Sequence, residues 1–152
     1  MERALKAEQY FYEGYACSQA VVLAFKDLVS TNEEDLLKIS LPLGGGLGRL
    51  RLTCGAISGV ALIVGLLFSS AEKSEENKLY VYSVIQELVK RFEEVRETIN
   101  CKELLEKASL EVEIAGKPEA RTQEYYHKRP CGKIVYDAAK VLEDYLKERG
   151  II

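Results

Sequence analysis

The sequence predicts an all-α fold, a single-domain compact bundle of five to seven helices over residues 1–152. Apolar residues recur at helical spacing along most of the chain, which is the primary signal of amphipathic helices. Only three prolines interrupt the 152 residues, and 47% hydrophobic with 30% charged residues is an ordinary globular composition. A chain of this length typically forms one domain.

Three helices are expected before the glycine-rich stretch. Residues 5–12 form a short first helix. Over residues 17–28, apolar side chains spaced three and four apart describe one buried face. A third helix over residues 33–39 begins with three acidic residues, which favour the positive end of a helix dipole, and Thr31 or Asn32 caps it.

The second half of the chain holds the longer helices. The segment Cys54–Phe68 is apolar on all sides and is expected to be the buried central helix, with Thr53 as its N-cap. Ser74 opens the longest helix, and Asn100 caps a short one. The predicted buried stripe of the longest helix is Val81, Val84, Ile85, Leu88, Phe92 and Val95.

The last third of the sequence contains the segment that is hardest to predict. Residues 111–128 are polar and carry Gly116 and Pro118, so they form either a long loop or a loop with a short helix. Pro130 suits the first position of a final helix. That helix is expected to bury Ile134, Val135, Ala138, Leu142 and Tyr145.

Charge and hydropathy exclude several classes of function. With 21 basic and 24 acidic residues the net charge is −3, so the chain lacks the positive field of a nucleic-acid-binding protein. The longest apolar run, residues 56–68, is shorter than a bilayer requires. No secretory leader is visible, and we therefore expect a cytoplasmic protein without a membrane span, whose cysteines are not structural disulfides.

The four cysteines share a position in the predicted helices. Cys17, Cys54, Cys101 and Cys131 each fall in the first turn of a helix, although none forms a Cys-x-x-Cys pair. Free amides and the positive dipole end at a helix start stabilise a thiolate, the form that attacks disulfides and binds metals. The same inward positions also suit inert cysteines that pack as small hydrophobic residues. Both interpretations remain open on the sequence alone.

The chain resembles the C-GCAxxG-C-C family of redox-active proteins. The matching stretches are residues 14–21, the glycine-rich residues 44–49, and Cys-Gly-Ala-Ile-Ser-Gly at residues 54–59, followed by the isolated Cys101 and Cys131. The resemblance covers about residues 10–145. It implies redox activity linked to four characteristic cysteines, and it names no substrate.

Residues beside Cys54 are candidates for binding a cofactor or an anion. Arg49 and Arg51 can hold an anion or raise the thiolate fraction of Cys54, or they can be solvated loop residues. Gly55 and Gly59 cost about 1 kcal/mol each against alanine in a helix. Either a bound group or backbone lies close to them, or the helix packs tightly on a neighbour.

We therefore expect a thiol-based redox protein that exchanges disulfides with a redox partner protein. Cys54 is the expected attacking thiol and Cys17 the resolving one, and this mechanism needs no cofactor. The first alternative is an iron–sulfur cluster or a zinc ion held by Cys17, Cys54, Cys101 and Cys131. The second is a structural or adaptor protein with inert thiols. A homo-oligomer is compatible with each of the three.

Overall fold

The computed structural model describes residues 2–152, and all regular elements in this range are helices. Eight α-helices form, one more than the upper limit expected from the sequence, because the polar segment contributes a short helix. They are α1 (Arg3–Tyr12), α2 (Cys17–Ala24), α3 (Glu33–Ser40), α4 (Gly55–Phe68), α5 (Glu75–Arg96), α6 (Cys101–Lys107), α7 (Gln123–Lys128) and α8 (Cys131–Glu148), with 3₁₀ turns η1 (Lys26–Leu28) and η2 (Leu41–Leu43).

Most predicted helix starts are found where the capping residues placed them. The side chains of Asn32, Ser74 and Asn100 each accept a hydrogen bond from the backbone N–H three residues later. Two starts differ by one residue, because Cys54 and Pro130 are themselves the N-cap residues of α4 and α8. The predicted helix over 17–28 ends at Ala24 and continues as the separate turn η1.

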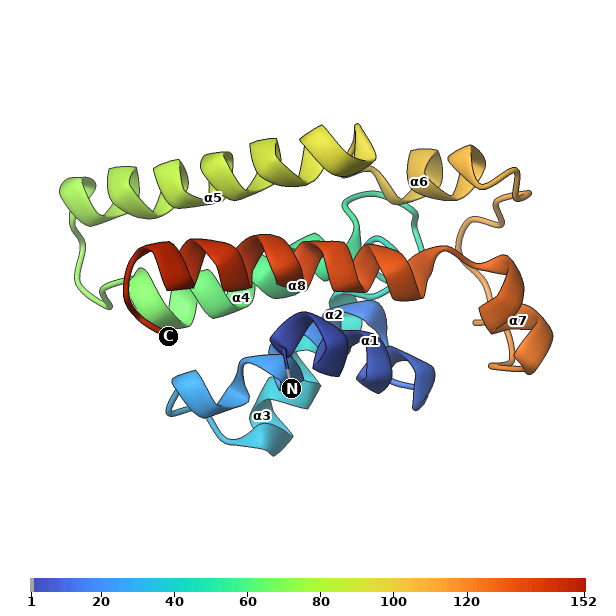
Figure 1. Cartoon of the computed structure of the whole chain (residues 1–152), viewed down its shortest axis with the longest axis horizontal. Coiled ribbons are helices and arrows are strands. Elements are labelled where there is room, and N and C mark those ends of the chain that lie inside the picture. Colours follow the sequence, from blue (N-terminus) through green and yellow to red (C-terminus); the bar gives the residue numbers. More distant parts are fainter. Residues whose placement is uncertain (1) are drawn as a thin grey trace.

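Helix α4 is the central element, as its apolar sequence predicted. It packs against α2, α5 and α8, and α8 also packs along α1. Figure 1 shows α5 and α8 running side by side in opposite directions, with α4 behind α8. The predicted buried residues of α8 are all buried. Of the residues predicted to be buried in α5, only Val84, Leu88 and Phe92 are, since this outer helix packs mainly against α4 and α8.

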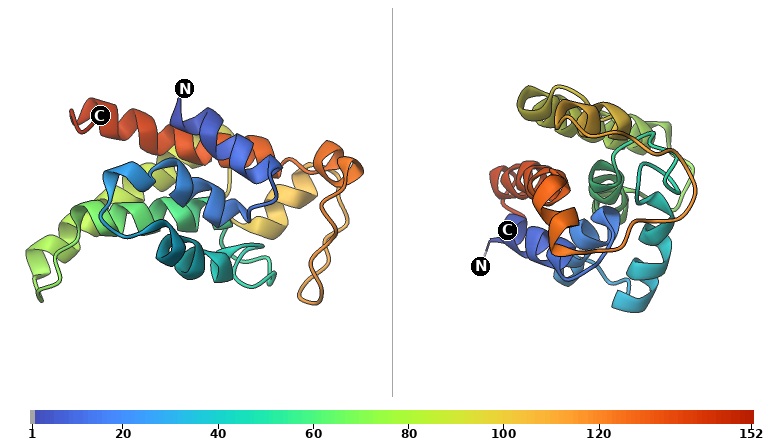
Figure 2. Two further views of the ribbon diagram at one scale, coloured as in Figure 1. Left: turned by 90° about the horizontal axis from the view of Figure 1, so that it is seen from below. Right: turned by 90° about the vertical axis from the view of Figure 1, so that its right-hand side faces the viewer.

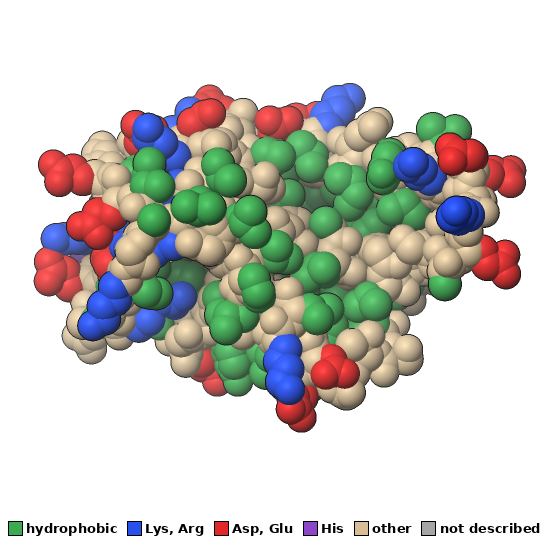
Figure 3. Space-filling model, turned by 180° about the vertical axis from the view of Figure 1, so that it is seen from behind, with side chains coloured by type: hydrophobic (Ala, Val, Ile, Leu, Met, Phe, Trp, Pro, Cys, Tyr) green, Lys and Arg blue, Asp and Glu red, His purple; other side chains and the backbone are tan. Residues whose placement is uncertain are grey.

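The connections bring the starts of several helices to one end of the molecule. The polar segment and α7 close this end, and Figure 2 shows residues 109–122 as a long loop that stands beside the bundle. In residues 2–152 no helix is long and apolar enough to cross a bilayer. Hydrophobic side chains nevertheless reach the surface and gather across the face shown in Figure 3. Among residues 2–152, the exposed large hydrophobic side chains, on whichever face, include Leu66, Leu79, Tyr82 and Val95.

Candidate functional site

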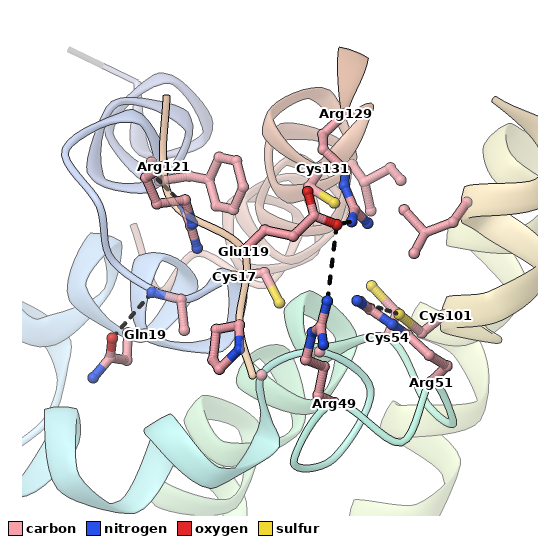
Figure 4. A pocket seen from close by; sticks show the side chains of 18 of the residues that line it. Cys17, Gln19, Arg49, Arg51, Cys54, Cys101, Glu119, Arg121, Arg129 and Cys131 are labelled. Atoms are coloured by element: carbon pink, nitrogen blue, oxygen red, sulfur yellow. Dashed lines mark hydrogen bonds and ion pairs between the residues drawn. The ribbon is translucent and has the colours of Figure 1, made fainter. Parts of the chain in front are cut away.

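A cavity of about 500 Å³ lies at the end of the bundle where the cysteine-bearing helix starts meet. Its wall is contributed by α1, α2, α4, α6, α7, α8 and the segments between them, so residues more than 100 positions apart line the same cavity (Figure 4). It includes every residue that the sequence singled out as a site candidate: Cys17, Arg49, Arg51, Cys54, Gly55, Cys101 and Cys131.

Backbone pairing ties the segment that carries Cys54 to the segment that carries Cys101. Thr53 and Asn100, the residues before them, form an isolated antiparallel bridge. The N–H of Cys54 donates to the carbonyl of Ile99 at 2.7 Å, and the N–H of Cys101 donates to the carbonyl of Leu52 at 2.6 Å. The starts of α4 and α6 are therefore tied together, although 46 residues separate their first helical positions.

Close packing places Cys17 against the start of α4. A Cβ atom added to Gly55 would lie 2.5 Å from Cys17 Sγ, far inside van der Waals contact. Because Gly55 has no side chain, the sulfur of Cys17 can lie directly against the start of α4, one residue after Cys54. Gly59 serves the packing of α2 on α4 instead, because its Cβ would lie 2.8 Å from the carbonyl oxygen of Ser18. Both glycines are explained by close neighbours, as the sequence suggested.

The loop before α4 directs two arginines inward. Leu47, Arg49 and Arg51 all have left-handed backbones, with φ of 73°, 67° and 61°. Such conformations cost roughly 1–2 kcal/mol for each non-glycine residue and persist where surrounding contacts determine them. Here Arg49 and Arg51 are both buried, at 8% exposure. They are not solvated loop residues.

Contacts to the polar segment hold these two side chains. Arg49 donates to the carbonyl of Ala115 at 2.7 Å and pairs with Glu113 at 3.4 Å. Arg51 donates from Nε to the carbonyl of Glu113 and from Nη1 to Cys101 Sγ, 3.8 Å away. Of the two arginines expected to act on Cys54, Arg51 therefore donates to the sulfur of Cys101 and Arg49 is paired with the polar segment.

Burial dominates the chemistry of the thiols, against the expectation for helix starts. Burial raises the pKa of Cys54 well above its ordinary range, and the neighbouring Cys17 raises it further. The amides of Ala56 and Ile57 lower it, in the sense that a helix start predicts, but they do not offset burial. A resting Cys54 thiolate at neutral pH, one basis for choosing it as the attacking thiol, is thus not supported.

Two other cysteines are also neutral thiols at neutral pH. Burial raises the pKa of Cys17, while amides of Gly45 and Ser18 and the charge of Arg121 act in the opposite direction. Burial raises the pKa of Cys131 to about 12. Both cysteines are less completely covered than Cys54, whose exposure is 6%, and they line the cavity. The cavity is therefore the route by which a reagent can reach them.

Sequence reasoning missed the contribution of residues 116–129 to the cavity. Glu119, Arg121, Tyr125 and Arg129 all belong to its wall. Glu119 lies between Arg49 and Arg129 and pairs with both (Figure 4). Their polar segment has no periodicity that would have shown which side chains point inward.

The four thiols do not form a ready metal site in the ligand-free chain. All are free, and within residues 2–152 no three His, Cys, Asp or Glu side chains are grouped so that they could hold a metal ion. A four-thiolate site would therefore require the helix starts to move toward one another.

Comparison with protein families gave one match. The model described as "Putative redox-active protein (C_GCAxxG_C_C)" matches residues 15–145, which include all four cysteines and the whole cavity except its contribution from the end of α1. Comparisons with curated proteins and with solved structures gave no match.

Proposed function

Since the chain belongs to the C_GCAxxG_C_C family of redox-active proteins, we propose that it reduces disulfides through the pair Cys17 and Cys54. The observation that carries this proposal is the contact of Cys17 Sγ with Gly55, the residue next to Cys54. The sulfur of Cys17 lies against the residue that follows Cys54, and this contact supports a disulfide between the two cysteines after a small movement.

The burial of the two thiols favours an order of attack opposite to the one expected from the sequence. Cys17 opens onto the cavity, and two amides and Arg121 favour its charged form. Its thiolate attacks one sulfur of the substrate disulfide, and the other sulfur leaves as a thiolate that takes up a proton. Cys54, after losing its proton, then attacks Cys17 Sγ and releases the second substrate thiol. The substrate gains two electrons, and Cys17 and Cys54 lose them as they form a disulfide.

Trapping the mixed disulfide tests this order. The reduced protein is mixed with bis(2-hydroxyethyl) disulfide, a neutral reagent, and followed by intact-protein mass spectrometry. Cys54→Ser should accumulate a mixed disulfide on Cys17, whereas Cys17→Ser should form almost none at the same time points. Cys131→Ser, which removes another thiol of the same cavity, serves as the matched control and should behave as the parent. Equal adduct formation by Cys17→Ser and Cys54→Ser would overturn the proposal, and an absence of any reaction in all proteins would favour inert thiols.

One observation favours the four-thiolate alternative: all four cysteines line the same cavity. A cluster or a tetrahedral zinc ion needs its full set of ligands. The metal content of anaerobically purified protein should therefore be lost equally in each of the four single Cys→Ser variants if this alternative is correct. Under the dithiol proposal, the parent carries no stoichiometric metal and only the Cys17 and Cys54 variants lose exchange.

A further inference from the structure

The charge of the cavity wall is opposite in sign to that of the whole chain. Its charged residues are four arginines, Arg49, Arg51, Arg121 and Arg129, and one acid, Glu119. The wall therefore carries a formal charge of +3 in a chain whose net charge is −3. A concave site lined by one sign of charge concentrates ligands of the other sign.

Two of the four arginines have no acidic partner among residues 2–152. Glu119 pairs with Arg49 and Arg129, and Glu113 also pairs with Arg49. Arg51 meets only a backbone carbonyl and the sulfur of Cys101. Arg121 donates to the carbonyls of Phe11 and Tyr15 and to the hydroxyl of Tyr126, all of them neutral.

An uncompensated buried charge is costly, so its retention calls for an explanation. Arg51 is 8% exposed, and removing a cation from water is expensive unless an anion meets it. Burial raises the pKa of Cys17, Cys54 and Cys131, so these three thiols do not provide that anion at rest. An anion bound in the cavity would supply the missing negative charge.

The two unpaired guanidinium groups lie near thiols of the cavity wall. The charge of Arg121 lowers the pKa of Cys17, and that of Arg51 lowers the pKa of Cys131. Arg121 is also fixed in place, since its guanidinium stacks 4.4 Å from the ring centre of Phe11 and 5.0 Å from that of Tyr125. An anion bound by these groups would lie beside the reacting sulfurs.

We infer that this cavity selects small anionic disulfides and thiols, whose carboxylates or equivalent anionic groups bind Arg51 and Arg121. The inference rests on the proposed disulfide exchange for the identity of the reacting group, but not for the binding of the anion. A cavity of about 500 Å³ is in the range that holds a small molecule. Guanidinium groups suit this task because their planar donors match the geometry of carboxylate and phosphate.

Anion binding can be measured without any redox step. Suberate has the chain length and both carboxylates of 3,3′-dithiodipropionate but no disulfide, and 1,8-octanediol is its neutral counterpart. Calorimetric titration should show saturable binding of suberate and none of the diol, and the suberate affinity should fall as salt is added. Arg51→Met and Arg121→Met should each weaken suberate binding by about tenfold or more, the loss typical of a charged hydrogen-bond partner.

Arg149→Met is the matched control. Arg149 also lacks an acidic partner and also stacks on an aromatic ring, that of Tyr145 at 4.8 Å, but it is exposed at the far end of α8. The Arg149→Met variant should bind suberate as tightly as the parent does. Equal binding of suberate and octanediol by the parent, or a loss in Arg149→Met as large as in Arg51→Met, would overturn the inference.

Exchange rates with three matched disulfides then test substrate choice. The dianion 3,3′-dithiodipropionate should react with the parent about tenfold faster than neutral bis(2-hydroxyethyl) disulfide, and the dication cystamine should react slowest, each rate being divided by that of free cysteine. This comparison uses the parent alone, so it holds even if an arginine variant fails to fold. Suberate binding without any exchange would refute the proposed function and leave anion binding standing. Exchange at equal rates with all three disulfides, without suberate binding, would refute the anion selectivity and leave the proposed function standing.

Discussion

At the scale of single residues, burial and helix position act on the Cys54 thiol in opposite directions. The first-turn amides of α4 favour its charged form, but the cost of burying a thiolate is larger, so the pKa rises. Burial raises the pKa of Cys17 and Cys131 in the same way. A position at the start of a helix is therefore insufficient to identify a reactive cysteine when the start is buried.

The raised pKa of Cys54 predicts a loss of stability at alkaline pH. An unfolded thiol loses its proton near pH 8.5, whereas the folded one keeps it, so its contribution is complete below that pH and declines as pH rises toward the folded pKa. In urea denaturation of the reduced proteins between pH 9 and 10, the free energy of unfolding of the parent should therefore fall more steeply with pH than that of Cys54→Ala. The difference should be up to about 1.4 kcal/mol per pH unit. The two slopes should coincide between pH 6 and 7.5. Identical slopes above pH 9 would show that Cys54 already ionises in the folded protein.

At the scale of helices, alanine substitutions at two glycines of α4 should change the free energy of unfolding in opposite directions. Gly59 faces α2, and an added Cβ would press on the Ser18 carbonyl oxygen at 2.8 Å and on Val21 Cβ at 3.0 Å. Gly59→Ala should therefore reduce the free energy of unfolding by about 1–3 kcal/mol, as overpacking does. Gly65, in the same helix, has only Ser69 Oγ near its added Cβ, at 3.9 Å.

Gly65→Ala should therefore raise the free energy of unfolding by about 0.5–1 kcal/mol, because alanine has the higher helix propensity and meets no clash. Chemical denaturation of both variants measures the pair. Destabilisation by both substitutions to the same extent would mean that the contact between α2 and α4 is not the reason for Gly59.

A second prediction at the scale of helices concerns the start of α1, which is capped by a side chain of α8. The carboxylate of Glu143 is buried and accepts hydrogen bonds from the backbone N–H groups of Arg3 and Ala4, at 3.3 and 3.2 Å. Glu143→Gln retains one acceptor oxygen, whereas Glu143→Ala leaves both amides unpaired. We expect the alanine variant to lose about 1–2 kcal/mol of stability and the glutamine variant less. Thermal or urea unfolding measures both losses of stability. Equal losses in the two variants would contradict this capping role of Glu143.

At the scale of the whole molecule, stability should be distributed unevenly around the cavity. Helix α4 provides one wall from the core, while residues 109–122 provide the opposite wall with few buried side chains. In hydrogen exchange followed by mass spectrometry, peptides from residues 56–64 should exchange last and those from 110–121 among the first, since local opening follows burial. Comparable protection of both segments would contradict this arrangement.

The exposed hydrophobic residues fit a homo-oligomer, which remains a prediction that light scattering can test.

The sequence by itself determined the local features of this protein. Helical periodicity, capping by Asn32, Ser74 and Asn100, and the shared position of the cysteines all depend on residues within about one or two turns of each other. The family pattern and the four cysteines could also be recognised without coordinates. These signals were sufficient for the all-α fold, its central helix, and seven residues of one cavity wall.

Only the tertiary structure decided the chemistry of that cavity. The pKa of a thiol depends on the solvent removed from it and on charges that arrive from distant segments, as Arg121 does beside Cys17 and Arg51 beside Cys101. Residues 109–122 carry no periodic pattern, so their place over the cavity could not be read from the sequence. Local patterns specify elements because they act through short-range contacts, whereas burial and electrostatics depend on how the complete chain packs.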